Sequence, residues 1–492
     1  MAFDWTFILS VYGLATCFAG AGLGIIWGAL PGLSVTMAMA LLVGLTYTMP
    51  ASLSIIFMIA VWTGAEFGGA ISAILLNMPG TPSAVPTQLA GYPLAKRGEG
   101  GLAIGTALTF SMLGNWAGLF VLLLLAPVMI ALALNFSSWE MFLLVTLGIS
   151  ISGSLTSGER PVKGWAMGCL GMLISMVGKD LIHGVDRFTF NISFFNAGIH
   201  YLPILIGLFG LAEALKVLNS STPKSIPAKM GRLLPPLSFV MKYWQSALRS
   251  SAVGTFIGAI PGVGANIASY VSYSLGEQFT GRRFSRGDFE GVVCSEVANN
   301  ANIGGGLLPT ITLGIPGNSS SALIIASLAL HGVVLGPTIE SDQPGFLLFL
   351  YVALLLANIF MYLSALALIR PSIYLLSMPA GVVMPSVLMF CLIGTFAASY
   401  SSFDVAVMFV AGIIGFILNR QNYPFAPLVL GALLGPTADE NLRRSILVNE
   451  GHYVDMLLRP IGLVLMIVII WSIYYGITRS TKTARRPYST DI

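Results

Sequence analysis

Charged side chains are scarce in this sequence: they make up 9% of its 492 residues, whereas hydrophobic residues make up 56%. A soluble chain typically carries about 25% charged residues, so this one has too few to cover a water-facing surface of its size. The shortage excludes a soluble enzyme and a disordered or fibrous protein. Because a membrane-spanning helix needs about 20 apolar residues, the sequence predicts an all-α polytopic membrane protein. We expect about ten to twelve crossings, some of them broken or re-entrant helices.

Other features are also missing. The four cysteines have no paired spacing, which argues against a disulfide framework and a metal knuckle. No His-Glu-x-x-His, Gly-x-Ser-x-Gly or phosphate-binding Gly-x-x-x-x-Gly-Lys-Ser/Thr motif occurs. We therefore expect no enzyme activity, no cofactor and no ATP hydrolysis, so that energy must come from an ion gradient or another subunit. The net charge of +4 is too small to suggest nucleic-acid binding. No Lys or Arg precedes Lys96, so the first apolar run is expected to be retained as a span.

The basic residues that are present mark a linker. Residues 219–246 are the longest hydrophilic stretch, and no Asp or Glu occurs between Glu213 and Glu277. By the positive-inside rule, this linker and the basic tail are cytoplasmic. The predicted organisation is a first membrane repeat (1–218), the linker (219–246), a second repeat (247–455), an additional C-terminal transmembrane helix (456–478) and a cytoplasmic tail (479–492).

The two halves share an internal repeat. The Gly-x-x-x-Gly-x-x-Pro-Gly of residues 24–32 recurs at 254–262, an offset of 230, and Glu66 matches Glu296 at the same offset. Residues 68–80 then match 305–317 at an offset of 237, so the second copy carries a seven-residue insertion. The sequence therefore predicts two homologous halves.

Charge indicates how the halves are oriented. The loop after the first copy contains Lys96 and Arg97, whereas the corresponding loop of the second copy contains Glu340 and Asp342 and no base. The first loop is typical of the cytoplasmic side and the second of the external side. This difference favours an inverted-topology repeat.

Each half contains a helix break in an apolar region. Pro79-Gly80 cannot continue a helix, and Thr81-Pro82 is suited to start one. Pro316-Gly317 is followed by Asn/Ser capping candidates in the same way. Two restarted helices would point unpaired N–H groups and positive dipole ends at an anion. The predicted substrate-binding residues are Asn77, Pro79, Gly80, Thr81, Pro82, Ser83, Pro316, Gly317, Asn318, Ser319, Ser320 and Ser321.

A second set of residues is predicted to bind an ion or to gate. Ionisable residues within a span are functional candidates, although each carboxylate could instead satisfy buried backbone N–H groups. The Gly-x-x-x-Gly motifs favour close helix packing. Their Pro-Gly pairs could support the starts of the two restarted helices, which we call the tips. This set comprises Pro31, Gly32, Glu66, Pro261, Gly262, Glu296, Asn299 and Asn300.

The longest motifs resemble a known family. Asn77-Met-Pro-Gly-Thr-Pro82, Gly91-Tyr-Pro-Leu-Ala95 and Leu313-Gly-Ile-Pro-Gly317 are similar to motifs of the large membrane subunit of bacterial tripartite tricarboxylate transporters, the TctA family. The segment Glu296-Val-Ala-Asn-Asn300 is also similar to a motif of this family. The resemblance covers about residues 10–478. It implies a multi-pass inner-membrane permease with elevator-like alternating access.

The resemblance also implies partners and a substrate class. The family works with a periplasmic solute-binding protein and a small membrane subunit of about four helices, and it takes up citrate and other carboxylates with an ion gradient, usually Na⁺. H⁺ coupling and homo-oligomer formation stay open. Two departures from the family pattern, Ala90 and Asn318, leave the particular carboxylate open.

Three other functions compete with this interpretation. Paired re-entrant tips also build selectivity filters, so a passive anion channel is the main alternative. A lipid-acting membrane enzyme and a structural scaffold are less favoured, because the catalytic constellations are missing and matched helix breaks serve no obvious scaffolding need.

Overall fold

The computed structural model describes residues 3–30, 33–156, 160–180, 184–218, 232–375, 380–450 and 452–484. The described chain is almost entirely helical, which confirms the predicted fold class. Eight of its helices are long and apolar enough to cross a membrane, and further apolar helices are shorter. The two short strands pair in one antiparallel hairpin, with Gly178 opposite Arg187.

The first half of the chain contains the following elements in order: η1 (Trp5–Leu9), α1 (Val11–Ala29), α2 (Val35–Thr46), α3 (Ala51–Leu76), η2 (Pro82–Ala84), α4 (Val85–Lys96), α5 (Gly100–Ala133), α6 (Ser138–Thr156), α7 (Pro161–Ser175), β1 (Gly178–Lys179), β2 (Asp186–Arg187), η3 (Ser193–Phe195), α8 (Tyr201–Leu205), η4 (Ile206–Leu211) and α9 (Ala212–Leu218). Of these, η4 is a π-helical segment that joins α8 to α9.

The second half continues as follows: α10 (Leu237–Lys242), α11 (Trp244–Gly258), α12 (Gly264–Thr280), η5 (Phe284–Arg286), α13 (Phe289–Leu313), α14 (Ser319–Ala329), α15 (Ile339–Asp342), α16 (Phe346–Leu375), α17 (Ala380–Ser399), α18 (Ser402–Arg420), α19 (Phe425–Val448), α20 (Tyr453–Leu457) and α21 (Pro460–Ala484). The described end of the predicted linker thus forms α10 and the start of α11.

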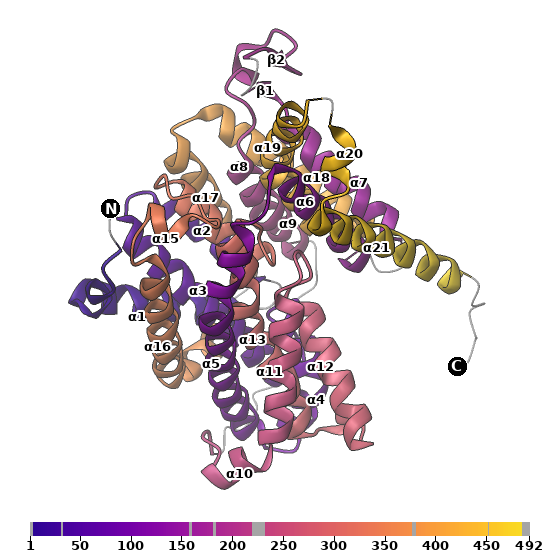
Figure 1. Cartoon of the computed structure of the whole chain (residues 1–492). Coiled ribbons are helices and arrows are strands. Elements are labelled where there is room, and N and C mark those ends of the chain that lie inside the picture. The colour runs from indigo at the N-terminus through magenta and orange to yellow at the C-terminus, as the bar shows by residue number, and fades with distance from the viewer. Residues whose placement is uncertain are drawn as a thin grey trace.

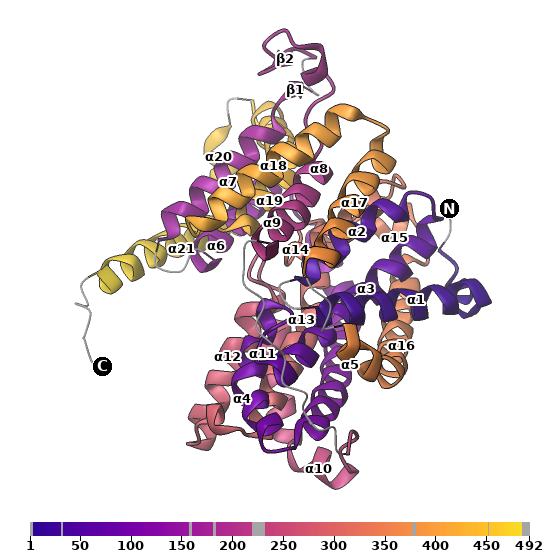
Figure 2. The same ribbon diagram turned by 180° about the vertical axis from the view of Figure 1, so that it is seen from behind.

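The helices form two lobes, each built from both halves of the chain (Figures 1 and 2). The first lobe contains α1, α3, α4, α5, α11, α12, α13 and α16. The second lobe contains α6 to α9 and α18 to α21. The helices α2, α14 and α17 lie between the lobes. The division matters because, as shown below, one wall of the main cavity comes from the first lobe together with α2 and α14, and the other comes from the second lobe.

The internal repeat in the sequence has a counterpart in the packing of the helices. A methyl group added to Gly24 would lie 2.3 Å from the carbonyl oxygen of Val61, and one added to Gly254 would lie 2.4 Å from that of Ala298. These contacts join α1 to α3 and α11 to α13. The same pairing therefore occurs twice, with offsets of 230 for the first helix and 237 for the second. Close approach of this kind is what the Gly-x-x-x-Gly spacing favours.

The helix ends show where the insertion lies. The helix α3 ends at Asn77 and α13 ends at Gly314, both in the left-handed conformation, with φ of 58° and 69°. The offset of 237 thus holds along the whole of α13, and the seven extra residues fall before it. The predicted equivalence of Glu66 and Glu296 is therefore wrong, because the counterpart of Glu66 is Ile303. The inverted orientation and the predicted boundaries stay predictions.

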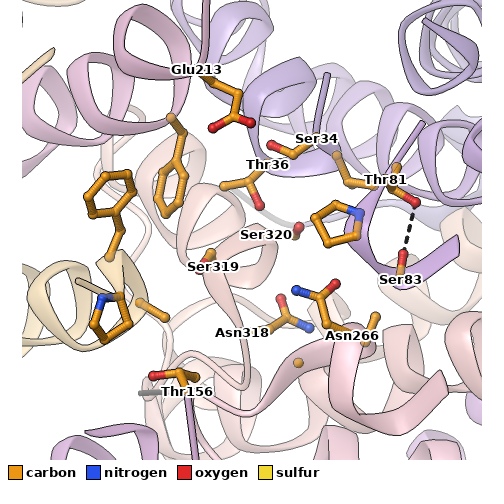
Figure 3. Close-up of a pocket in the computed structure, with 18 of the residues that line it drawn as sticks. Ser34, Thr36, Thr81, Ser83, Thr156, Glu213, Asn266, Asn318, Ser319 and Ser320 are labelled. Atoms are coloured by element: carbon orange, nitrogen blue, oxygen red, sulfur yellow. Dashed lines mark hydrogen bonds between the residues drawn. The ribbon is translucent and has the colours of Figure 1, made fainter. Parts of the chain in front are cut away.

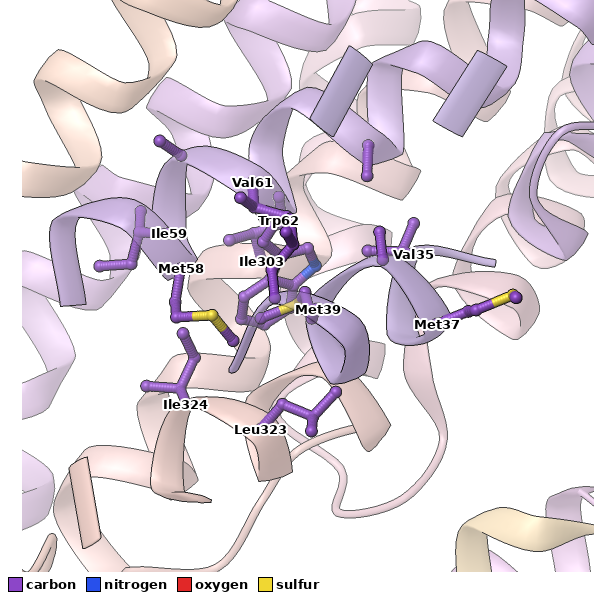
Figure 4. Packing of buried hydrophobic residues seen from close by; sticks show 14 of the residues in the cluster. Val35, Met37, Met39, Met58, Ile59, Val61, Trp62, Ile303, Leu323 and Ile324 are labelled. Atoms are coloured by element: carbon purple, nitrogen blue, oxygen red, sulfur yellow. The ribbon is translucent and has the colours of Figure 1, made fainter. Parts of the chain in front are cut away.

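A buried hydrophobic cluster contains side chains of the helices that flank both helix breaks. Met39 of α2, Met58 and Trp62 of α3, Ile303 of α13 and Leu323 of α14 all belong to one buried cluster (Figure 4). The cluster joins elements from both repeats. Because close-packed interiors deform little, this core fixes the helix starts described next.

Candidate functional site

A cavity of about 460 Å³ opens between the two lobes. One wall comes from α2, α3, η2, α12 and α14, and the other from α6, η4, α9, α18 and α19. Figure 3 shows the polar side chains gathered around it. The polar and charged lining residues are Ser34, Thr36, Glu66, Thr81, Ser83, Thr156, Glu213, Lys216, Asn266, Asn318, Ser319, Ser320, Asn419, Asn422 and Tyr423.

The first helix break forms one tip of this cavity. After the end of α3, Gly80 N donates to Gly69 O at 3.3 Å, which turns the chain back against its own helix. Thr81 occupies the N-cap position of η2 and Pro82 the first helical position, as the sequence predicted. The Thr81 hydroxyl makes no capping bond, however, because it lies 3.0 Å from Ser83 Oγ instead. Ser83 Oγ in turn donates to Glu66 Oε2 at 3.0 Å.

The second break forms the opposing tip. Ser321 N donates to Asn318 Oδ1 at 2.8 Å and Asn318 N donates to Ser321 Oγ at 3.0 Å, so the start of α14 carries a complete capping box. Asn318 Nδ2 also donates to Asn302 Oδ1 at 3.1 Å, which ties the tip to α13. The carbonyl oxygen of Gly317, a predicted substrate-binding residue, accepts from Gly262 N at 2.8 Å.

Two further helices start at the same cavity. Helix α2 begins after Ser34, whose hydroxyl accepts from Met37 N at 3.1 Å, and α12 begins at Gly264 next to Asn266. Each follows one of the matched Pro-Gly pairs at residues 31–32 and 261–262. Four helix starts, two from each half, therefore surround one space. Helix N-termini carry partial positive charge and free N–H groups, so the arrangement suits an anion.

Some of the predicted residues line the cavity, and others do not. Those that line it are Glu66, Thr81, Pro82, Ser83, Gly262, Asn318, Ser319 and Ser320. The lining does not include Asn77, Pro79, Gly80, Pro261, Glu296, Asn299, Asn300, Pro316, Gly317 and Ser321. Pro31 and Gly32 lie outside the described residues. Of the predicted residues that do not line the cavity, Asn77 is exposed, and it accepts two hydrogen bonds from Gln88.

The second predicted carboxylate lies in the packed interior of the first lobe. Glu296 is completely buried, and its two oxygens accept from Thr87 Oγ1 at 2.5 Å and Ser111 Oγ at 2.9 Å. Asn300 Oδ1 accepts from Asn115 Nδ2 at 3.2 Å. The side chain of Asn299 is fully buried as well. These residues form a polar interior behind the cavity, rather than part of its wall.

Sequence reasoning missed the second wall. Phe209, Glu213 and Lys216 reach the cavity from η4 and α9, and Asn419 and Asn422 reach it from the end of α18. No repeated motif marks these positions. The one available signal was the pair of charges, Glu213 and Lys216, at the end of an apolar run.

Comparison with known proteins places these features in a family. The family model described as the tripartite tricarboxylate transporter TctA family matches residues 14–430. An uncharacterized 52.8 kDa protein in the TAR-I ttuC' 3' region of Agrobacterium vitis is 32% identical over 489 residues, covering 97% of this chain and 95% of that protein. An uncharacterized protein in the TAR-II ttuC' 3' region of the same organism is 33% identical over 224 residues, covering 44% of this chain and 93% of that protein.

Proposed function

Because the chain belongs to the tripartite tricarboxylate transporter TctA family, we propose that it is the permease subunit that carries a carboxylate across the bacterial inner membrane. The observation that supports this most directly is the convergence of four helix starts on one cavity between two lobes. Its volume of about 460 Å³ suits a small molecule. Citrate and related carboxylates are the proposed substrates, and alternating access is the proposed mechanism.

The tips hold the substrate without a fixed cation. Thr81, Ser83, Asn318, Ser319 and Ser320 are neutral, so hydroxyls, amides and helix dipoles provide the attraction. A desolvated lysine or arginine at this point would be costly when the site is empty and would hinder release of a carboxylate. Neutral tips therefore favour reversible binding.

An ion gradient drives the uptake in this proposal. Glu66 is nearly buried, lines the cavity and accepts from Ser83 Oγ next to the first tip. A cation bound near Glu66 would neutralise it and would attract the substrate carboxylate. Na⁺ is the proposed coupling ion and H⁺ the alternative. A periplasmic solute-binding protein would deliver the substrate, and a small membrane subunit of about four helices would complete the complex.

Uptake into proteoliposomes tests this function. With an imposed Na⁺ gradient, the complex should accumulate citrate or another carboxylate above the external concentration, in a saturable manner. Replacing Na⁺ by choline should abolish the accumulation. Equilibration without accumulation would instead support a passive channel, and uptake that is unchanged without Na⁺ would contradict Na⁺ coupling.

Variants of the tips test the site. Thr81→Val and Asn318→Ala each remove a polar group from the cavity wall, so we expect the KM for the substrate to rise about tenfold, the effect of one lost hydrogen bond. Matched controls are Thr109→Val, whose hydroxyl bonds within α5, and Asn135→Ala, which is exposed away from the cavity. Kinetics like those of the wild type in both tip variants would contradict the assignment.

A further inference from the structure

The wall opposite the tips carries a charged pair that the proposed function has not used. Phe209, Glu213 and Lys216 are spaced by four and three residues and line the cavity together. Residues with this spacing lie on one face of a helix. The face is held in place by η4, where a methyl group on Gly207 would lie 2.4 Å from the carbonyl oxygen of Met408 in α18. The pair is therefore fixed to the second lobe.

The two charges contact each other. Lys216 Nζ lies 2.9 Å from Glu213 Oε1, and the Lys216 side chain is 54% exposed. The Glu213 side chain is 20% exposed. Because the lysine of this ion pair is more than half exposed to water, the pair adds little stability and the lysine can take another anionic partner. Lys216 is thus held by a weak, replaceable contact at the rim of a cavity built for an anion.

The distribution of charge around the cavity is uneven. Among the described lining residues, Lys216 is the one lysine or arginine, and Glu66 and Glu213 are the acids. With a first carboxylate at the neutral tips, a second carboxylate that extends across the cavity meets the wall formed by the second lobe. Among these residues, Lys216 is the one cationic donor available to it there, so that both partners of the hydrogen bond are charged.

We propose that Lys216 binds a second anionic group of the substrate and that Glu213 competes with that group for Lys216. This proposal rests on the proposed carboxylate transport. It adds that Lys216 and Glu213 determine the preference for a dicarboxylate over a monocarboxylate. Without substrate, Glu213 neutralises Lys216. With a dicarboxylate, the substrate takes the place of Glu213, so that one molecule contacts both lobes. A monocarboxylate reaches the tips alone and cannot displace Glu213.

A thermodynamic cycle tests the contact between Lys216 and the second carboxylate. The affinities of the purified complex for a C4 dicarboxylate and for its monomethyl ester are measured by calorimetry, with wild type and Lys216→Gln. The wild type should bind the dicarboxylate about tenfold or more tightly than the ester, the value of one charge-assisted hydrogen bond. In Lys216→Gln this preference should disappear while the affinity for the ester is kept, and Lys216→Arg should restore it.

A second variant tests the competition. Glu213→Gln removes the competing charge, so the dicarboxylate should bind more tightly than to the wild type and the ester should be unaffected. Lys242→Gln, at an exposed lysine of α10 outside the cavity, is the matched control. An unchanged affinity for the dicarboxylate in Glu213→Gln would overturn the role of Glu213.

The outcomes separate this proposal from the proposed function. If Lys216→Gln lowers the affinity for both ligands equally, or for neither, Lys216 does not bind the second carboxylate. This proposal then fails, although the transport function stands. If the wild type binds no carboxylate at all, the transport function fails and this proposal fails with it. Thermal unfolding of each variant shows whether it is folded, and if Lys216→Gln is not folded, Lys216→Met takes its place in the same comparison, with the same outcome expected.

Discussion

At the scale of single residues, the shape of each tip depends on a glycine. A methyl group on Gly80 would lie 2.0 Å from the carbonyl oxygen of Gly28, and one on Gly317 would lie 2.5 Å from Cα of Gly306. Both positions are crowded by backbone, which cannot move aside as a flexible side chain can. The breaks therefore need glycine for close approach, in addition to the proline that ends the helix.

Alanine substitutions test this requirement. Gly80→Ala and Gly317→Ala should each lower the free energy of unfolding by about 1–3 kcal/mol, the usual cost of overpacking, and should reduce uptake. Thermal unfolding of the purified protein and proteoliposome uptake measure the two effects. Gly381→Ala is the control, because nothing lies within 4 Å of the added methyl group in α17. Equal melting temperatures for all three variants would contradict the close-approach argument.

Single residues also show how far the sequence could be interpreted. The tips were predictable because Pro-Gly followed by Thr or Asn is a local signal: Pro82 and Asn318 start their helices where expected. The partner of the Thr81 hydroxyl was not predictable, because this hydroxyl pairs with Ser83, whose own hydroxyl donates to the buried Glu66 of α3. Likewise, the false match of Glu66 with Glu296 arose because matched residues on either side of an insertion do not show where the insertion lies.

At the scale of elements, the second wall shows the limit of prediction from motifs. Helix α9 lines the cavity because η4 changes the helical geometry just before it and places Phe209, Glu213 and Lys216 toward the tips. A π-helical segment has no clear sequence signature, but such segments are frequent at functional sites. The apolar residues before Glu213 predict that this segment is a membrane span. They do not predict which face of the helix lines the cavity.

The hairpin of β1 and β2 is a second element held by charge. Arg187 Nη2 donates to Asp180 Oδ1 at 2.8 Å and to Asp439 Oδ2 of α19 at 2.9 Å. Arg443 Nη1 donates to the other oxygen of Asp180 at 2.7 Å. Because the Asp180 side chain is only 2% exposed, these bonds are partly shielded from water. They join the hairpin to the end of α19 away from the cavity.

Removing Arg187 should loosen this junction. Arg187→Gln leaves Asp180 with Arg443 as its charged partner, so we expect a loss of about 1.5–3 kcal/mol, the value of hydrogen bonds to charged groups. Amide hydrogen exchange in the hairpin should become faster, as measured by mass spectrometry. Lys179→Gln, at an exposed position of the same hairpin, should leave the exchange rate unchanged. The same exchange in both variants would show that the ion pairs do not hold the hairpin.

At the scale of the whole molecule, the two lobes share one cavity that a substrate must fill from both sides. Thr36 and Thr156 lie on opposite walls, as Figure 3 shows. Cys169 is the exposed native cysteine among the described residues, whereas Cys17, Cys294 and Cys391 are buried. A Cys169→Ser background therefore allows single cysteines to be placed on each wall.

Labelling of such cysteines tests the shared cavity. Thr36→Cys and Thr156→Cys should both react with a charged maleimide, and substrate should slow both reactions. At ten times the Kd, only about one site in eleven is free, so each rate should fall about tenfold. Lys242→Cys on the exposed α10 should not respond to substrate. Protection of one wall alone would contradict a site formed by both lobes.

The reciprocal packing of the halves has a consequence for how this architecture could arise. A methyl group on Gly171 of α7 would lie 2.0 Å from the carbonyl oxygen of Leu428 in α19, and one on Gly431 would lie 2.2 Å from that of Gly168. Gly171 comes from the first half of the chain and Gly431 from the second, so each half covers a glycine of the other. A shorter chain that contained one half alone would leave its glycine uncovered unless a second copy packed against it.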